Sequence, residues 1–218
     1  MRVGILGGTG PAGRALGARL AASGTQVVIG SRDPGRAEAA CAQLRQRWPG
    51  RALALEGASN QEAAGADLVV LSTPWEGAEA TVSALADRLE GKVVVSMVNA
   101  MAKVGQELQA LALARGSVAA GVQAAAPGAL VAGAFHHLPA ALLADLDRRL
   151  GADVLVFSDH PRATEEASRL VGSVPGLRPL DAGGLASAGP VEAFTAVVVG
   201  LNARYRAQAS VRITGIGE

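Results

Sequence analysis

Three glycines near the start of the chain have a spacing that suits dinucleotide binding. Gly8, Gly10 and Gly13 follow the apolar run Arg2–Leu6 and fit the pattern G-x-G-x-x-G. In such a turn the first glycine allows a tight bend, the second lets backbone N–H groups approach a pyrophosphate, and the third lets the next helix pack closely on the strand. The N-terminus of that helix also carries partial positive charge, which favours phosphate groups. The pattern therefore predicts a dinucleotide site; the alternative is a strand–helix turn that binds nothing.

The residues after the second predicted strand indicate which nucleotide binds. Sites for NAD place an aspartate or glutamate there to accept a hydrogen bond from the ribose 2′-hydroxyl. This chain has Ser31 and Arg32 at that point and Arg36 one helical turn later. A hydroxyl and two guanidinium groups can hold a 2′-phosphate through charge-assisted hydrogen bonds, so NADP(H) is favoured. Asp33 is discordant unless it caps the next helix, and the alternative for both arginines is a solvated surface.

Polar residues also follow three later predicted strands. Thr73 and Pro74 come after one buried strand, Asn99 after the next, and His136 after a third. Because ligands of open α/β sheets bind beyond the carboxyl ends of the strands, these residues should line one crevice. A structural role is the alternative for His136.

Motifs for other kinds of chemistry are absent from the sequence. No group of His, Cys, Asp and Glu residues has metal-ligand spacing, so no metal site is expected. The sequence has no G-x-S-x-G motif and no Cys–His pair that would indicate hydrolysis. Lys92 begins a predicted strand, which is the wrong edge of the sheet for a Schiff base.

The elements that must position these residues alternate between strands and helices. The predicted strands are continuous runs of Val, Ile and Leu, which indicates a sheet covered by helices on both faces. The expected fold class is therefore α/β, with a Rossmann-like, doubly wound, mainly parallel sheet and a small C-terminal helical segment. Strands are expected at 2–6, 26–30, 51–55, 67–72, 92–98, 130–135, 154–157 and 177–180. Helices are expected at 11–22, 34–48, 60–66, 76–89, in two stretches within 104–125, at 161–174 and at 190–206.

Length and charge limit the organisation and the partners. A chain of 218 residues suits a nucleotide-binding domain over 1–183 followed by a helical segment over 184–218. A net charge of +1 and an aromatic content of 3% exclude a basic nucleic-acid binder with stacking rings. The apolar stretch 118–135 is interrupted by Pro127 and Gly128, so no membrane span is expected there. Cys41 is the only cysteine, and a cytoplasmic location is the simplest interpretation.

Six segments in order along the chain match one specific pattern. They are GILGGTGPAGRALGARLAASG, VVIGSR, LSTPWEGA, AFHHLPA, GLRPLDAGGLASAGPVEAFT and NARYRAQASVRITGI. Together they resemble the NADPH-dependent reductases of coenzyme F420, also called F420H2:NADP oxidoreductases. The resemblance covers nearly the whole chain, and its PWE, H-x-x-P-A and RPLDAG segments are much more specific than the glycine turn.

The resemblance implies an activity and a role for individual residues. Coenzyme F420 is an 8-hydroxy-5-deazaflavin, and members of the family pass a hydride directly between the nicotinamide and the deazaflavin. They are dimers formed through the C-terminal portion. For NADP(H), the resemblance implies that the pyrophosphate is held by Thr9, Gly10, Pro11 and Ala12, and the 2′-phosphate by Ser31, Arg32 and Arg36. It places Thr73 and Asn99 along the path to the nicotinamide and Ala140 at the nicotinamide carboxamide. For F420, it implies His136, Leu138 and Pro139 beside the deazaflavin, Thr195 beneath it and Val211 closing the pocket.

Such a reaction needs no nucleophile, because the two cofactors carry the chemistry. The protein must hold the rings together and exclude water, and a donor such as His136 at the N1–C2 edge would stabilise the reduced deazaflavin. One rival is an NADP-dependent dehydrogenase or imine reductase of a small substrate, but such enzymes generally carry a larger helical domain and need a proton donor. Another is a non-catalytic NADP sensor, which leaves AFHHLPA and RPLDAG unexplained.

Overall fold

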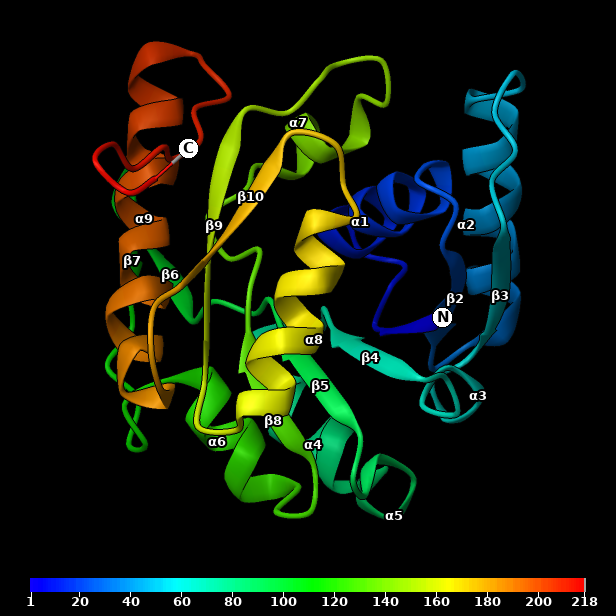
Figure 1. The fold of residues 1–218 in the computed structure, drawn as a ribbon, viewed down its shortest axis with the longest axis horizontal. Coiled ribbons are helices and arrows are strands. Elements are labelled where there is room, and N and C mark those ends of the chain that lie inside the picture. Colours follow the sequence, from blue (N-terminus) through cyan, green and yellow to red (C-terminus); the bar gives the residue numbers. More distant parts are fainter. Residues whose placement is uncertain (218) are drawn as a thin grey trace.

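An eight-stranded sheet forms the centre of the computed structural model, which describes residues 1–217 (Figure 1). The strand order is β10-β9-β8-β5-β4-β1-β2-β3. Neighbouring strands are parallel except β8 and β9, which confirms the mainly parallel sheet. The strands are β1 (Arg2–Leu6), β2 (Gln26–Ser31), β3 (Leu55–Ser59), β4 (Leu68–Leu71), β5 (Val93–Ser96), β8 (Leu130–Gly133), β9 (Ala152–Ser158) and β10 (Leu177–Asp181).

Helices cover both faces of this sheet, and each face has its own apolar cluster. Side chains alternate across a strand, so Ile5 packs in one cluster and Leu6 in the other. The first cluster includes residues of α1 (Pro11–Ala22), α2 (Pro34–Arg47), α7 (Ala140–Ala144) and α8 (Pro161–Gly172). The second includes residues of α3 (Asn60–Ala63), α4 (Ala78–Ser83), α5 (Ala86–Leu89), α6 (Val118–Ala125) and α9 (Ala188–Tyr205). The doubly wound arrangement is therefore confirmed.

The order of the strands reverses between β1 and β4. From β1 the chain proceeds outward through β2 and β3, and then returns to place β4 and β5 on the other side of β1. Loops that leave β1 and β4 thus diverge to opposite faces of the sheet. A crevice opens at such a reversal, beyond the carboxyl ends of the strands.

The strand expected at 51–55 is wrong in position, because β3 runs from Leu55 to Ser59. Its sequence, LEGAS, has little strand propensity. Gly57 is required there by close packing, since a Cβ on it would lie 2.3 Å from the backbone nitrogen of Glu38 in α2. Packing against α2, which the sequence pattern does not report, fixes this edge strand.

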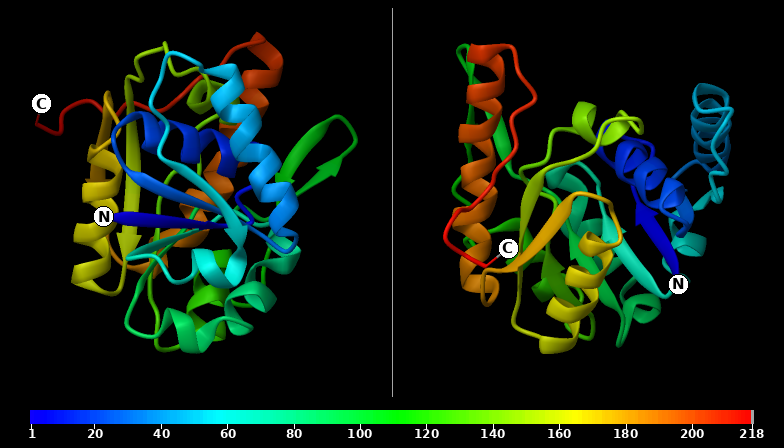
Figure 2. Two further views of the ribbon diagram at one scale, coloured as in Figure 1. Left: turned by 90° about the vertical axis from the view of Figure 1, so that its right-hand side faces the viewer. Right: turned by 45° about the horizontal axis from the view of Figure 1, so that its top comes forward.

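The helix expected in the first part of 104–125 is also wrong. This region forms an antiparallel hairpin of β6 (Met101–Val104) and β7 (Glu107–Ala110), with Gly105 at a φ of +60° in the turn. The hairpin lies along α9 and projects from the body of the molecule (Figure 2). Contact with α9 therefore overrides the helix propensity of its Glu, Gln, Leu and Ala residues. The second part is α6, as expected.

Two smaller differences concern helices. The helix expected at 76–89 is divided into the 3₁₀ turn η1 (Trp75–Gly77), α4 and α5, and the Thr81 hydroxyl donates to the Gly77 carbonyl at 2.7 Å. Such side-chain bonds compete with a regular helix. The short helix α7 was not expected, and a second 3₁₀ turn, η2 (Leu185–Ser187), precedes α9.

The segment after α9 returns to the sheet and is attached to β9 and β10. Asp153, fully buried in β9, accepts from the Arg178 guanidinium through both carboxylate oxygens at 2.8 Å. The same aspartate accepts from the Ile213 N–H at 2.6 Å, and Arg178 donates to the Ile213 carbonyl. The Arg178 guanidinium holds the pKa of the Asp153 carboxyl below its usual value. This ion pair fixes the course of the C-terminal segment.

Candidate nucleotide-binding site

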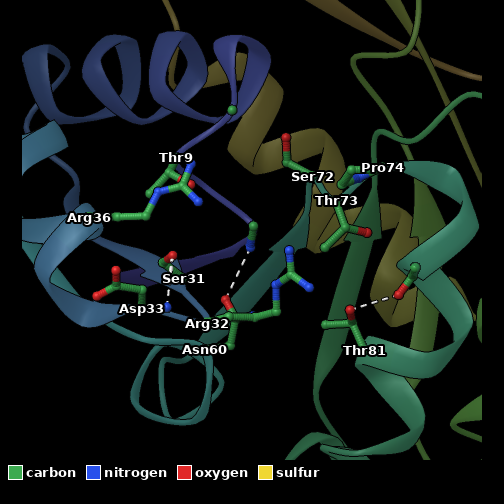
Figure 3. A pocket seen from close by; sticks show the side chains of 13 residues that line it. Thr9, Ser31, Arg32, Asp33, Arg36, Asn60, Ser72, Thr73, Pro74 and Thr81 are labelled. Carbon is green, nitrogen blue, oxygen red and sulfur yellow. Dashed lines mark hydrogen bonds between the residues drawn. The ribbon is translucent and has the colours of Figure 1, made fainter.

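A cavity of about 460 Å³ lies at the reversal point, between the ends of β1 and β4 (Figure 3). It is bounded by the glycine loop on one side and by η1 and α4 on the other. Most of its lining side chains are polar or basic. The lining residues are Gly7, Thr9, Gly10, Ser31, Arg32, Asp33, Arg36, Asn60, Ser72, Thr73, Pro74, Gly77 and Thr81.

The glycine loop is held in the conformation that the G-x-G-x-x-G pattern requires. The Gly8 N–H donates to the Gly30 carbonyl at 2.9 Å, which ties the loop to β2. A Cβ on Gly13 would lie 2.7 Å from the Cα of Gly8, so α1 reaches the loop only because position 13 is glycine. The N-cap of α1 is Gly10, which supplies no capping side chain, and Pro11 follows at the first helical position. The free N–H groups of this first turn are therefore available to an anion.

The residues after β2 form a further wall of the cavity. The Asp33 carboxylate accepts from the Gly35 N–H at 3.0 Å and so caps α2. Ser31 accepts from the Asp33 N–H at 3.2 Å, which leaves the hydroxyl proton of Ser31 free to donate. Arg32 and Arg36 are exposed, form no ion pair within residues 1–217, and extend into the space between the loop and the end of β4 (Figure 3). Asp33 also lines the cavity, but its carboxylate caps α2 and is outnumbered by Arg32 and Arg36, so the wall is suited to a phosphate.

Asn60 is a site residue that sequence reasoning missed. Its side-chain oxygen accepts from the Gly7 N–H at 3.1 Å and fixes the start of the glycine loop. Asn60 directly follows β3, and a polar residue in that position is a sign of a site residue. The sequence pattern places the strand at 51–55 instead, so Asn60 does not stand out. Thr81 also lines the cavity and is not predicted, because the sequence pattern indicates one continuous helix over 76–89 and so does not show where α4 begins.

A second group of predicted residues lies beyond β5 and β8. The Asn99 side chain donates to the His136 carbonyl at 3.1 Å, and the His136 ring stacks on Phe157 with centroids 5.4 Å apart. Burial lowers the pKa of His136 to about 3, so its imidazole is neutral at physiological pH. Phe135, directly before it, has a φ of +66°, an uncommon conformation that fixes how the chain leaves β8.

Several buried polar atoms in this region have no hydrogen-bond partner among residues 1–217. They are the Thr73 hydroxyl, the Asn99 side-chain oxygen, and both ring nitrogens of His136 and of His137. Buried polar groups are nearly always paired, so these unpaired atoms are places where a partner from outside residues 1–217 is expected.

The remaining predicted residues do not line the 460 Å³ cavity. Ala140 begins α7 and, with Pro11, borders a second cavity of about 390 Å³. Leu138 is buried and Pro139 is the N-cap of α7. Thr195 is buried in α9, and the Val211 carbonyl accepts from the Asp153 N–H at 2.8 Å. The first cavity thus brings together Thr9 and Gly10 with Ser31, Arg32 and Arg36, but its lining includes neither Pro11 and Ala12 nor the residues predicted for the deazaflavin.

Comparison with known proteins gives consistent matches. Residues 2–100 match the family described as NADP oxidoreductase, coenzyme F420-dependent. Along its whole length the chain is 33% identical to the F420-dependent NADP reductase of Methanothermobacter thermautotrophicus, covering 97% of that protein. It is 34% identical to the reductase of the same name from Methanocaldococcus jannaschii, with 99% of each chain covered.

Solved structures show the same relationship. A crystal structure from Arthrobacter sp. FB24, of a candidate F420-dependent NADP-reductase, superposes with a TM-score of 0.83 at 26% identity and covers 98% of this chain and 99% of that one. The imine reductase of Streptomyces aurantiacus shares the fold alone, with a TM-score of 0.58 at 16% identity. This chain corresponds to only 62% of the imine reductase, as expected if imine reductases carry a larger additional domain.

Proposed function

The chain belongs to the family of F420-dependent NADP oxidoreductases, and from this premise we propose that it passes a hydride directly between NADP(H) and coenzyme F420. The observation that carries the proposal is identity of 33–34% along essentially the whole length of curated reductases of that name. The phosphate-suited cavity at the strand reversal supports it independently. A small-substrate reductase or an NADP sensor would share that cavity but not the full-length similarity.

In this proposal the 460 Å³ cavity holds the adenosine half of NADP(H). Gly8, Thr9, Gly10, Pro11, Ala12 and Gly13 surround the pyrophosphate, and Ser31, Arg32 and Arg36 hold the 2′-phosphate. The free N–H groups at the start of α1 support the pyrophosphate assignment. The Asp33 carboxylate caps α2, which leaves Arg32 and Arg36 available for the 2′-phosphate. Thr73, Pro74 and Asn99 then lead toward the nicotinamide, whose carboxamide would meet the backbone of Ala140.

The ring end of the site positions two substrates. When both are bound, the nicotinamide and the deazaflavin supply the hydride chemistry between them. The task of this chain is to orient the rings and to exclude water around them. His136, Leu138 and Pro139 would border the deazaflavin, with Thr195 and Val211 contributed by α9 and the segment after it. Because His136 is neutral, it would donate one N–H to a carbonyl edge instead of acting as a cationic acid.

We further propose a homodimer formed through the segment 184–218, which would also complete the deazaflavin pocket. One face of α9 carries four exposed apolar side chains at helical spacing, and the adjoining hairpin adds two. They are Phe194, Val197, Leu201 and Tyr205, with Val104 and Leu108 of the hairpin. Residues 185–205 are long and apolar enough to cross a membrane by length and composition. A second copy of this chain accounts for the same surface, and the buried free Cys41 suits the cytoplasm.

The test of the activity is a spectroscopic assay. The protein is mixed with NADPH and oxidised F420, and loss of the visible deazaflavin band is followed. The proposal expects turnover with NADPH, and a KM for NADH that is roughly ten- to hundredfold higher, from the loss of charge-assisted bonds to the 2′-phosphate. Binding of NADPH without any reduction of F420 would instead support a sensor or a small-substrate reductase.

A further inference from the structure

The second cavity, of about 390 Å³, is lined mostly by residues that are not assigned to either substrate; only Pro11 and Ala140 are. It is a groove along α1, closed by the last turns of α2 on one side and by α7 on the other. Its floor is formed by small residues, so the backbone of α1 is approached closely. The lining residues are Pro11, Arg14, Ala15, Ala18, Gln43, Leu44, Arg47, Trp48, Ala140, Ala141 and Ala144.

The groove is positively charged. Among residues 1–217, Arg14 and Arg47 are its only charged lining residues, and no carboxylate of that range lines it. Arg14 donates to the Gln43 side chain at 2.9 Å, and Arg47 lies over the Trp48 ring at 5.7 Å. Neither arginine forms an ion pair in the described part of the chain. A nearby cation, Arg51, also lies over the Trp48 ring at 5.9 Å but is paired with Asp147. Two unneutralised guanidinium groups beside an apolar floor suit a flexible anion with a carbon chain.

The groove shares two residues with the proposed nucleotide site. Pro11 opens α1 directly after Gly10, which lines the first cavity, and Ala140 opens α7 and is assigned to the carboxamide. Both residues also line the groove. From Pro11 to Ala18 the groove follows α1 for about 10 Å, since a helix rises about 1.5 Å per residue. A molecule whose ring lies at the nicotinamide can therefore extend its side chain into this groove.

We propose that the groove is the subsite for the anionic tail of the deazaflavin substrate. Coenzyme F420 carries a ribityl side chain that ends in a phosphodiester, a lactyl group and glutamate carboxylates. The ribityl and lactyl carbons would lie over the alanines of α1 and α7, and the phosphate and carboxylates would pair with Arg14 and Arg47. The proposal rests on the proposed function, because it assigns one part of the same second substrate. The phosphates of NADP(H) are already accommodated in the other cavity, on Arg32 and Arg36.

The experiment compares two deazaflavins that share the reacting ring. One is F420, and the other is the tail-less alcohol that ends at the ribityl group. Dissociation constants for both are measured by quenching of deazaflavin fluorescence. The kcat and the KM for each deazaflavin are measured with saturating NADPH, and the KM for NADPH is measured with saturating F420. The wild type and the variants Arg14→Gln and Arg47→Gln are compared with Arg88→Gln, which removes the same charge from the exposed surface of α5.

The expected result is selective. Each groove variant weakens F420 binding roughly fivefold, the upper range for a partly exposed ion pair. Affinity for the alcohol, kcat and the KM for NADPH stay unchanged, and Arg88→Gln behaves as the wild type. Equal effects on F420 and the alcohol, or no effect on either, would overturn the subsite while leaving the activity intact. If the wild type binds and reduces neither deazaflavin, the proposed function fails and the subsite fails with it.

Discussion

At the scale of single residues, the nucleotide site depends on which charged groups already have a partner within the fold. Asp33 is committed to the N-terminus of α2, while Arg32 and Arg36 have no carboxylate partner among residues 1–217. Sequence reasoning predicted this division from residue types alone, because an aspartate directly before Pro34 is a common helix cap. It did not predict Asn60, whose role depends on a contact across 53 residues.

A first prediction concerns Arg36. Replacement by alanine removes a cation from the wall assigned to the 2′-phosphate, so the KM for NADPH should rise roughly tenfold. The KM for NADH and the kcat should not change, because neither involves that phosphate. Arg169→Ala, which removes an exposed arginine paired only with Glu165 on α8, is the matched control. Steady-state kinetics with both nucleotides provide the measurement, and an equal rise for NADH would contradict the assignment.

A second prediction concerns the pH dependence of stability. The pKa of His136 falls from 6.5 to about 3 on folding because the ring is buried. The unfolded chain therefore binds a proton that the folded chain does not, and stability is lost as pH falls below about 6.5. Between pH 7.5 and 5.5 this residue should cost about 1.4 kcal/mol of unfolding free energy.

The variant His136→Gln isolates that contribution because glutamine does not titrate. Its unfolding free energy, from urea denaturation at the two pH values, should fall by about 1.4 kcal/mol less than that of the wild type. His137, whose pKa is also lowered by burial, remains in both proteins and cancels in the comparison. Identical losses in the two proteins would show that the pKa of His136 is the same in the folded and unfolded states.

At the scale of elements, α7 is held in place by one buried arginine of α1. Arg19 is 5% exposed and donates to the carbonyl groups of Leu142 and Leu143 in α7 and of Asp145 and Arg148 just beyond it. The last turn of a helix leaves its carbonyl groups without a partner in the helix, so Leu142 and Leu143 need such a donor. Arg19 thereby fixes Ala140 and the groove beside it.

A third prediction follows for Arg19. Replacement by methionine keeps the apolar stem but removes the donors, leaving several buried carbonyls unpaired. The free energy of unfolding should fall by about 3 kcal/mol, as for other losses of a buried charged group with several bonds. Arg14→Met, on the same helix but partly exposed, should change it by less than about 1 kcal/mol. Similar small losses in both variants would show that α7 is held by apolar contacts instead.

The elements that the sequence predicted well are those whose signal is local. The boundaries of α1 follow from Pro11 at its start and the apolar spacing after it, and the buried strands follow from their Val, Ile and Leu runs. The elements it missed depend on distant partners. The hairpin of β6 and β7 needs α9, β3 needs the glycine contact with α2, and α7 needs Arg19.

At the scale of the whole molecule, the exposed apolar face of α9 is the feature that a single copy does not satisfy. Val197 is 56% exposed and Tyr205 76% exposed, on a helix that stands at one side of the molecule (Figure 2). Apolar surface of this kind is typical of protein interfaces, and it supports the proposed dimer. The division into 1–183 and 184–218 proposed above places that interface in the second part.

A fourth prediction tests the interface. In sedimentation equilibrium the wild type should have twice the chain mass of 21.8 kDa, and the double variant Val197→Glu, Leu201→Glu should have the mass of one chain. A matched control places one glutamate at the exposed position Gln46 of α2 and should remain dimeric. A monomeric wild type would contradict the dimer, and sedimentation only with lipid vesicles would favour membrane association of α9.

The central claim is direct hydride transfer between NADPH and coenzyme F420. NADPH that carries deuterium stereospecifically at the nicotinamide C4 is mixed with oxidised F420 and the protein in ordinary water, with each C4 epimer tested separately. The account predicts that one epimer yields reduced F420 with one deuterium at C5, seen by mass spectrometry and NMR, and that the other yields unlabelled product. Bound NADPH with no reduction of F420, or reduced F420 without deuterium from either epimer, would contradict it.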